Sequence, residues 1–202
     1  MDFSLENSYN LKNIAGIDEA GRGPLCAPVF ASCVVLDRNK FPKGVNDSKK
    51  LTEKKRDDIF DEILGLEEAG YLFYGIGIGT IEEIDEVNIR NATKLAMKRS
   101  YEDLVEKYKV NVDLVIVDGN FIPDIDVRSE FVIKGDSKSI SIATASIIAK
   151  VNRDRLLYEL DLKYPQYNWK KNKGYGTREH IDAIKKYGIC EYHRKSFVKN
   201  FI

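Results

Sequence analysis

Short apolar runs of strand length alternate along the chain with longer segments of helical periodicity, and this order limits the folds that the chain can adopt. We expect strands at 14–18, 27–36, 71–79, 112–117 and 128–134, and helices at 52–64, 80–108, 139–164 and 178–187. Strands first, followed by alternating helices and strands, predict a mixed α/β sheet with helices packed on it. With 202 residues, 43% of them hydrophobic, the chain is long enough to bury one substantial core.

Small residues stand out in two of the expected elements. Gly75, Gly77 and Gly79 leave one face of the strand at 71–79 without side chains. Their spacing does not fit a dinucleotide-binding loop, because no third glycine follows at the GxGxxG distance. Small residues also fill the first turns of the helix expected from Ser139, which predicts close packing of this helix on the sheet.

Acidic residues recur where the expected strands end beside glycine. Asp18 and Glu19 precede a Gly-Arg-Gly turn, while Asp118 and Asp136 each stand next to a glycine at a later strand end. Sheets of the α/β class bind ligands beyond the carboxyl ends of their strands. If these carboxylates converge at one edge, they form a hard oxygen site that suits Mg²⁺ or Mn²⁺.

Each acid alone has a simpler interpretation, and other catalytic motifs are missing. Asp118-Gly119 is a common turn signal, and Asp136 could cap the helix that follows it. The sequence has no GxxxxGK[ST] phosphate loop. The two histidines, His180 and His193, lack the spacing of zinc ligands or of a nucleophile triad. We expect both to be surface or hydrogen-bonding residues.

Charge is balanced overall but separated along the chain. Lys plus Arg and Asp plus Glu each number 32, whereas residues 163–202 carry ten basic and three acidic residues. Such a segment is often a solvated helix face, and it also suits an anionic ligand. Three cysteines without CxxC spacing, the lack of a long apolar run and the lack of a signal-peptide pattern predict a cytoplasmic protein with no membrane partner.

Two polar clusters have the composition of ligand-binding loops. The segment 46–51 (NDSKKL) precedes an expected helix and offers hydrogen bonds and charge to a phosphate, although a plain turn and helix start explains it equally well. Tyr175 stands between Gly174 and Gly176, so its ring is free to project as a stacking surface for a base or a sugar. Packing of this ring against the domain is the alternative.

These segments together resemble the bacterial-type ribonuclease HII family, the type 2 ribonucleases H that cut RNA joined to or paired with DNA. The matching segments follow the family order over nearly the whole chain: GIDEAGRGP (16–24), NDSKKL (46–51), EIDEVNIRNAT (83–93), VDGN (117–120), KGD (134–136), SIATASIIAKVNRD (141–154), YPQY (164–167), KGYGT (173–177) and HRKSF (193–197). The resemblance implies a ribonuclease H-like fold, with a mixed five-stranded sheet flanked by helices and additional C-terminal helices. It also implies one catalytic domain over 1–202, with 163–202 as a basic helical and loop region packed on it.

The resemblance implies an activity as well. A member of this family is an endoribonuclease that hydrolyses the RNA strand of RNA/DNA hybrids and cuts 5′ of single ribonucleotides in duplex DNA. Asp18, Glu19, Asp118 and Asp136 would hold two divalent ions, Mn²⁺ or Mg²⁺, that align a water for in-line attack and give 3′-hydroxyl and 5′-phosphate ends. The implied partners are RNA/DNA hybrids and DNA that contains ribonucleotides, and we expect a monomer.

Substrate contacts carry over from the family by position. Gly21, Arg22 and Gly23 correspond to the turn that reads the ribose 2′-hydroxyl and adjoining phosphates, largely through backbone groups. Tyr175 corresponds to the tyrosine that packs on the deoxyribose after the junction. Further phosphate contacts are expected from a set of polar and basic residues: Asn46, Ser48, Lys49 and Arg194.

The chain departs from the family pattern at several positions. Cys26-Ala27-Pro28 replaces the usual Ala-Gly-Pro, Thr144 replaces a common alanine, and Asn172 stands where many members have histidine. The change at Asn172 is expected to alter a phosphate contact. None of these positions is an expected metal ligand.

Two functions from other classes stay open at this point. One is a catalytically silent nucleic-acid-binding module that uses the basic tail and Tyr175. The other is a carboxylate-metal phosphoryl hydrolase that acts on a small substrate.

The first motif makes one structural prediction. Neighbouring residues in a regular strand point to opposite faces. The strand at 14–18 must therefore end or distort at Asp18-Glu19 if both carboxylates are to reach the same metal.

Overall fold

The computed structural model describes residues 1–46, 48 and 50–202, and its described strands form one five-stranded sheet in the order β3-β2-β1-β4-β5. The strands are β1 (Ile14–Ala20), β2 (Val29–Leu36), β3 (Leu72–Gly79), β4 (Leu114–Asp118) and β5 (Ser129–Val132). β2 runs antiparallel to both β1 and β3, whereas β1, β4 and β5 are parallel to one another. The sheet is mixed, as expected, and the carboxyl ends of β1, β4 and β5 lie at the same edge.

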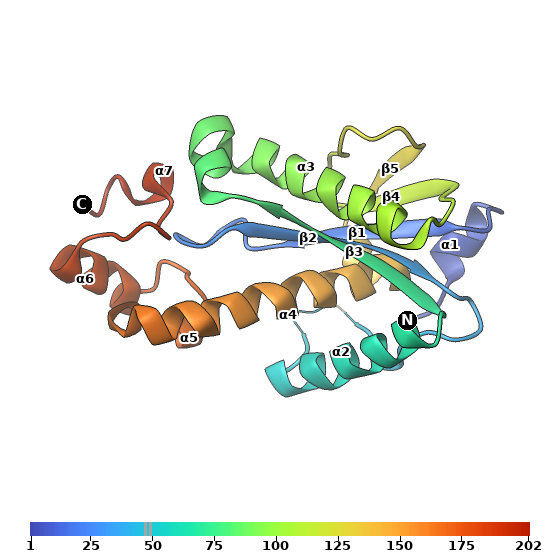
Figure 1. Cartoon of the computed structure of the whole chain (residues 1–202), viewed down its shortest axis with the longest axis horizontal. Helices are drawn as coiled ribbons and strands as arrows, with labels where there is room; N and C mark the ends of the chain where they lie inside the picture. The colour runs from blue at the N-terminus through green and yellow to red at the C-terminus, as the bar shows by residue number, and fades with distance from the viewer. Residues whose placement is uncertain (47, 49) are drawn as a thin grey trace.

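Long helices cover both faces of the sheet (Figure 1). α3 (Ile81–Tyr108) packs on one face, and α4 (Ile140–Lys163) packs on the other together with α2 (Glu53–Glu68). The remaining elements are short: α1 (Ser4–Ser8), the 3₁₀ turns η1 (Gly135–Ser137) and η2 (Pro165–Tyr167), α5 (Trp169–Asn172), α6 (Arg178–Tyr187) and α7 (Lys195–Val198). Within the described residues, no helix is long and apolar enough to cross a membrane.

The helices α3, α4 and α6 each begin at a side chain that caps the first turn. Thr80 Oγ1 accepts the Glu83 N–H at 3.2 Å, and the Glu83 carboxylate accepts the Thr80 N–H at 2.9 Å, which is a capping box for α3. The hydroxyls of Ser139 and Thr177 cap α4 and α6. The short helices α1, α5 and α7 were not predicted, because four or five residues are too few to show a helical period.

Glycines allow the helices to lie directly on the sheet. A Cβ added at Gly77 would lie 2.0 Å from the Ala96 carbonyl oxygen of α3, and Gly75 and Gly79 are similarly crowded by α3 backbone. On the other face, a Cβ at Gly16 of β1 would lie 2.4 Å from the Ile142 backbone nitrogen of α4. The glycine run of β3 therefore serves helix packing, and the prediction of a close approach by α4 is confirmed.

The C-terminal elements lie beyond the end of β1, at the left of Figure 1. They share a buried apolar cluster with the loop after β1 and the last turns of α4; its buried members are Leu25, Cys26, Ala27, Leu157, Leu160, Tyr167, Trp169, Ala183, Ile184 and Val198. Cys26 also forms an isolated antiparallel bridge with His193. The basic C-terminal region is therefore attached to the segment that follows the first acidic pair.

Replacing Gly77 with alanine should destabilise the chain by more than about 2 kcal/mol, because α3 would have to move away from β3 to admit the new Cβ. Gly65→Ala is the matched control, since Gly65 lies in α2 with open space around its Cα; this change should stabilise by about 0.5–1 kcal/mol. Urea unfolding followed by circular dichroism measures both effects. Equal stability of the two variants would contradict the close packing of α3.

Candidate active site

Acidic residues gather at the carboxyl edge of the parallel strands. Ile17 of β1 pairs with Val117 of β4, so the next residues, Asp18 and Asp118, are neighbours at this edge. β5 runs parallel to β4 and is followed by η1, which carries Asp136. Strand order and strand direction thus bring three of the acidic positions to one edge.

The Asp118 carboxylate is bound to the turn that carries Asp136. Asp118 Oδ1 accepts the Gly135 N–H at 2.6 Å. A Cβ added at Gly135 would lie 3.3 Å from Asp118 Oδ1, so a glycine allows this turn to close. The alternative interpretation of Asp136 as the cap of α4 is wrong, because Ser139 is the cap and its hydroxyl accepts the Ile142 N–H at 3.1 Å.

Asp18 is buried against α4, with 5% of its surface exposed. Burial raises the pKa of the Asp18 carboxyl well above its usual range, and the charges of Glu19 and Asp118 raise it further. Hydrogen bonds from Ser146 and from the Glu19 N–H oppose this rise. Ser146 Oγ also lies 2.8 Å from Ser48 Oγ, so one residue of α4 links Asp18 to the loop 46–51.

β1 does not end at Asp18, and this part of the sequence prediction is wrong. The strand continues to Ala20 in regular pairing with β2. Only the pairing with β4 stops, at Ile17, and the Glu19 N–H donates instead to Asp18 Oδ1 at 2.7 Å. The pleat therefore starts the two side chains on opposite faces of β1. Glu19 Oε1 lies 3.3 Å from Arg22 Nη1.

The donor chemistry of this edge fits a hard divalent cation, although its side chains do not yet surround a common point. In the described part of the chain, no three His, Cys, Asp or Glu side chains are grouped as metal ligands. Asp118 contacts the Gly135 N–H, and Glu19 contacts Arg22. Burial and the neighbouring carboxylates raise the pKa of Asp18, and a cation beside Asp18 would stabilise its charged form, so this set of oxygen donors fits a divalent cation.

Arg194 holds the turn at residues 21–23 from the inside. Its guanidinium is fully buried and donates to four backbone carbonyls, those of Gly21 (2.6 Å), Arg22 (3.1 Å), Pro24 (2.8 Å) and Ala27 (2.9 Å). The prediction that Arg194 contacts a substrate phosphate is therefore wrong. A fully buried arginine that donates to carbonyls positions the turn, and it has no surface left for a ligand.

The same contacts decide where the N–H groups of the turn point. In a trans peptide, the carbonyl and the N–H of the next residue point in opposite directions. The carbonyls of Gly21 and Arg22 face Arg194, so the N–H groups of Arg22 and Gly23 face away from it. Both N–H groups belong to exposed residues, and neither has a hydrogen-bond partner among the described residues. The turn thus presents two backbone donors next to Glu19.

A second buried arginine at this turn, Arg153 of α4, was not predicted from the sequence. Arg153 donates to the carbonyls of Lys173 (3.1 Å) and Cys26 (3.2 Å). Gly21 has a φ of +100°, and a Cβ there would lie 2.1 Å from Arg153 Nε. Burial, together with the charge of Arg153, lowers the pKa of Arg194 to about 9. The available signal was an arginine that shares a helix face with Ala149, Leu156 and Leu157.

Tyr175 projects from the surface beside the turn at 21–23. Its side chain is half exposed, and a Cβ added at Gly23 would lie 3.5 Å from Tyr175 Cε1. Asn172 holds the backbone before it, because its Oδ1 accepts the Gly174 N–H at 2.8 Å and its Nδ2 donates to the Tyr167 carbonyl at 2.7 Å. The predicted projection of the Tyr175 ring is confirmed. Asn172 is buried and holds the turn, so it is not presented to a phosphate in this arrangement.

The two histidines lie in the interior, which corrects the expectation that they could be surface residues; their expected hydrogen bonding is confirmed. His180 Nε2 and His193 Nε2 are 3.2 Å apart, and Trp169 Nε1 donates to His180 Nε2 at 3.0 Å. His180 Nδ1 lies 3.0 Å from the Tyr175 carbonyl oxygen. Burial lowers the pKa of both imidazoles, and the charge of His180 helps to lower that of His193 to about 4.

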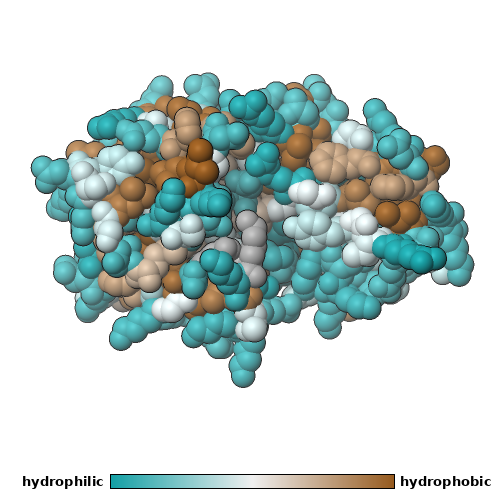
Figure 2. Space-filling model, turned by 180° about the vertical axis from the view of Figure 1, so that it is seen from behind, coloured by the Kyte–Doolittle hydropathy of each residue, from teal (hydrophilic) through white to brown (hydrophobic). Residues whose placement is uncertain are grey.

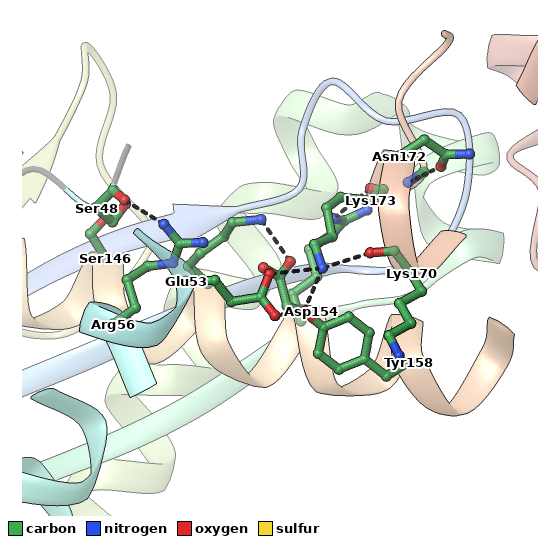
Figure 3. A network of polar contacts seen from close by, with 12 residues as sticks. Ser48, Glu53, Arg56, Ser146, Asp154, Tyr158, Lys170, Asn172 and Lys173 are labelled. Atoms are coloured by element: carbon green, nitrogen blue, oxygen red, sulfur yellow. Dashed lines mark hydrogen bonds and ion pairs between the residues drawn. The ribbon is translucent and has the colours of Figure 1, made fainter. Parts of the chain in front are cut away.

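The loop 46–51 only partly matches the expected phosphate contacts. Ser48 is buried, and its hydroxyl contacts Ser146, so it is not presented to a phosphate in this arrangement (Figure 3). Asn46 is exposed, and Lys49 lies outside the described residues. Arg56 of α2 holds the loop, since its Nη1 donates to the carbonyls of Ser48 (3.0 Å) and Leu51 (2.6 Å).

A second polar group ties α2 to the segment before Tyr175. Lys173 Nζ donates to the Tyr158 hydroxyl and to the Lys170 carbonyl, and it lies 3.4 Å from Glu53 Oε2. The Tyr158 hydroxyl in turn donates to Glu53. Figure 3 shows these side chains, from α2, α4 and the 170–173 segment, directed toward one another. The network holds the start of α2 and the turn 173–177 on the same side of α4.

Comparisons with known proteins point to one family. The model of the family described as Ribonuclease HII matches residues 15–200. The ribonuclease HII of Clostridioides difficile is 56% identical over 189 residues, covering 94% of this chain and 71% of that protein. The ribonuclease HII of Acetivibrio thermocellus is 54% identical over 193 residues, covering 95% of this chain and 72% of that protein.

Solved structures agree with the sequence comparisons. The crystal structure of ribonuclease H2 from Pyrococcus horikoshii superposes with a TM-score of 0.72 at 25% identity, covering 94% of this chain and 97% of that one. The ribonuclease HII of Archaeoglobus fulgidus, solved in a complex with PCNA, gives a TM-score of 0.70 at 26% identity, covering 91% and 94% of the two chains. The ribonuclease H-like fold that the sequence motifs imply is therefore confirmed.

Arg194→Lys should destabilise the chain by about 2–4 kcal/mol, because an ammonium cannot reach all the carbonyls that the guanidinium satisfies and leaves buried acceptors unpaired. Arg178→Lys is the matched control, since the Arg178 side chain is 96% exposed and its loss should change stability by less than about 0.5 kcal/mol. Urea unfolding near neutral pH tests the pair. A mild effect at Arg194 would contradict its role in holding the turn.

His193→Gln should flatten the dependence of stability on pH. The pKa of His193 is about 4 in the folded chain against an ordinary value of 6.5, so the unfolded chain takes up the proton first and stability is lost as pH falls through this range. Between about pH 7.5 and about pH 5 the loss is on the order of 2 kcal/mol. Glutamine keeps a donor for His180 but does not titrate. Urea unfolding at both pH values measures the difference, and parallel profiles would refute the assignment.

Proposed function

The chain belongs to the ribonuclease HII family, endonucleases that act on RNA/DNA hybrids, and from that premise we propose that it also cuts duplex DNA on the 5′ side of a single embedded ribonucleotide. The proposal treats residues 1–202 as one catalytic domain, with 163–202 as a basic region that helps to hold the nucleic-acid backbone. The expectations of a monomer and of a cytoplasmic location stay predictions.

The observation that carries the proposal is the pair of outward N–H groups at Arg22 and Gly23. These donors lie between the carboxylate edge and the half-exposed ring of Tyr175. A backbone donor can bind a 2′-hydroxyl or a phosphate oxygen, and the 2′-hydroxyl distinguishes RNA from DNA. Tyr175 would pack on the deoxyribose that follows the ribonucleotide. Recognition of the sugars on both sides of the ribonucleotide–DNA junction would then be combined in one place.

The carboxylates of Asp18, Glu19, Asp118 and Asp136 would hold the divalent cations, Mn²⁺ or Mg²⁺. When bound, two such cations supply activation of the attacking water and stabilisation of the departing oxygen. To bind a cation, the Asp118 carboxylate would give up its hydrogen bond from the Gly135 N–H, and the Glu19 carboxylate would give up its ion pair with Arg22. Arg22 is then free to contact a phosphate. The expected products carry a 3′-hydroxyl and a 5′-phosphate.

Two rival functions make different predictions. A silent nucleic-acid-binding module would bind the duplex without cutting it in any divalent metal. A phosphoryl hydrolase of small substrates would turn over free phosphate esters, whereas a junction-specific endonuclease would not. Family membership and the carboxylate edge argue against the first, and the exposed Tyr175 beside the turn argues against the second.

Asp118→Asn should abolish cleavage while leaving duplex binding intact. Wild-type protein should cut a duplex with one ribonucleotide in Mn²⁺ or Mg²⁺, and the variant should lose at least about 100-fold in rate, because even indirect metal partners contribute 10–100-fold. Asp61→Asn, at an exposed carboxylate of α2, is the control and should cut normally. Gel assays measure cleavage and fluorescence anisotropy measures binding.

An intact wild-type duplex throughout a metal series would refute the proposed junction activity. Equal cleavage by Asp118→Asn and wild type would refute the assigned carboxylate role.

A further inference from the structure

Beneath Tyr175 lies a buried row of polar rings that the proposed chemistry does not use. Trp169 of α5, His180 of α6 and His193 before α7 are all 1% exposed or less. Their hydrogen-bonding nitrogens meet at His180 Nε2. The far side of the His180 ring faces the backbone of Tyr175 itself. The row therefore connects the C-terminal helices to the one aromatic side chain that the site presents to solvent.

The contacts fix the tautomer of each imidazole. A carbonyl oxygen only accepts, so His180 must carry its proton on Nδ1 to bond the Tyr175 carbonyl. Nε2 of His180 is then an acceptor, which agrees with the donation from Trp169 Nε1. His193 Nδ1 accepts the Cys190 N–H at 3.1 Å, so His193 carries its proton on Nε2 and donates it to His180. Trp169 and His193 thus both donate to His180, and His180 donates to the Tyr175 carbonyl.

Tyr175 needs such an anchor because its neighbours do not restrain it. Gly174 and Gly176 flank it, and glycines leave the backbone a wide choice of conformations. Three hydrogen bonds limit that choice. The Tyr175 N–H donates to the Asn172 carbonyl at 3.0 Å, and the Tyr175 carbonyl accepts from His180 Nδ1 and from the Thr177 N–H at 2.8 Å. Of these, the contact with His180 is the one that comes from a side chain in a separate helix.

We propose that His180 is a positioning residue that aims the Tyr175 ring at the sugar after the junction, and that His193 and Trp169 hold His180 in the required tautomer. The inference rests on the proposed recognition role of Tyr175 and assigns a residue that acts through it. His180 is fully buried and touches no substrate. Its effect should therefore appear in the choice between substrates and not in duplex affinity.

Two substitutions at His180 separate the contact with Tyr175 from packing. Asparagine places an amide N–H near the position of Nδ1 and keeps the donor to the Tyr175 carbonyl. Glutamine places an amide oxygen near the position of Nε2, keeps the acceptor for Trp169 and loses that donor. His180→Asn removes more volume, so a purely structural role predicts that it is the more damaging change. The positioning role predicts the opposite order.

The readout is the ratio of kcat/KM on a duplex with one ribonucleotide to kcat/KM on a continuous RNA/DNA hybrid, both in Mn²⁺. His180→Gln should lower this ratio about tenfold, because a misplaced contact group costs rate at the reacting bond. His180→Asn should stay within about twofold of wild type. Duplex affinity should change little in either variant. A larger loss of the ratio in His180→Asn than in His180→Gln would overturn the inference.

A double substitution provides the second arm. In a Tyr175→Ala background, His180→Gln should have no further effect on the ratio, since its action passes through the missing ring. Independent, multiplying losses would overturn the inference. Wild-type protein that does not cut the junction duplex would refute the proposed function instead, so the two failures are distinguishable.

A spectroscopic measurement on the wild-type protein tests the inference even if a variant does not fold. Long-range ¹H–¹⁵N spectra of the wild-type imidazoles report which nitrogen carries the proton. We expect His180 protonated on Nδ1 and His193 on Nε2 near neutral pH. A His180 found with its proton on Nε2 could not donate to the Tyr175 carbonyl, and that result would overturn the inference whether or not the enzyme is active.

Discussion

Two buried guanidiniums, those of Arg153 and Arg194, set the conformation of the loop after β1, and the candidate site depends on that loop. Residues 21–28 connect β1 to β2, and most of their carbonyls accept no hydrogen bond from a neighbouring strand. Buried carbonyls need partners, and the arginines supply them from α4 and from the C-terminal segment. Burying two like charges is unfavourable, and burial together with the charge of Arg153 accordingly lowers the pKa of Arg194. Charge-assisted hydrogen bonds, four from Arg194 and two from Arg153, offset part of that cost.

The carboxylate edge shows the opposite balance, because there the fold gathers like charges without providing equal compensation. Strand order alone makes Asp18 and Asp118 neighbours, and α4 buries Asp18. The Ser146 hydroxyl and backbone N–H groups accommodate these carboxylates in part. A divalent cation would compete with those local partners for the same oxygen atoms. The carboxylates at this edge therefore favour a ligand with more positive charge than the hydroxyl and N–H groups that contact them.

Much of the fold could be predicted from the sequence, because strand runs, helix periods and capping boxes are local signals. The helix starts at residues 80 and 139 were predicted correctly, and so was the close packing of α4 on the sheet. The position of buried polar residues could not be predicted in this way. Arg194 contacts Gly21 across 173 positions of sequence, and a buried arginine looks the same in a sequence as a surface one. For the same reason, the burial of the two histidines could not be predicted. The end of β1 was placed too early because the pairing of β1 with β2 continues beyond Asp18.

Buried arginines and histidines together explain how one site can depend on backbone groups for recognition. Backbone donors have no side-chain rotamers, so their direction is set by whatever holds the adjoining carbonyls. At Arg22 and Gly23 that partner is Arg194, and at Tyr175 it includes His180. Arg194 and His180 both belong to the C-terminal region, which also packs on Cys26 through His193. The C-terminal region therefore orients both the N–H groups of the turn and the backbone of Tyr175, which places the two recognition elements relative to each other.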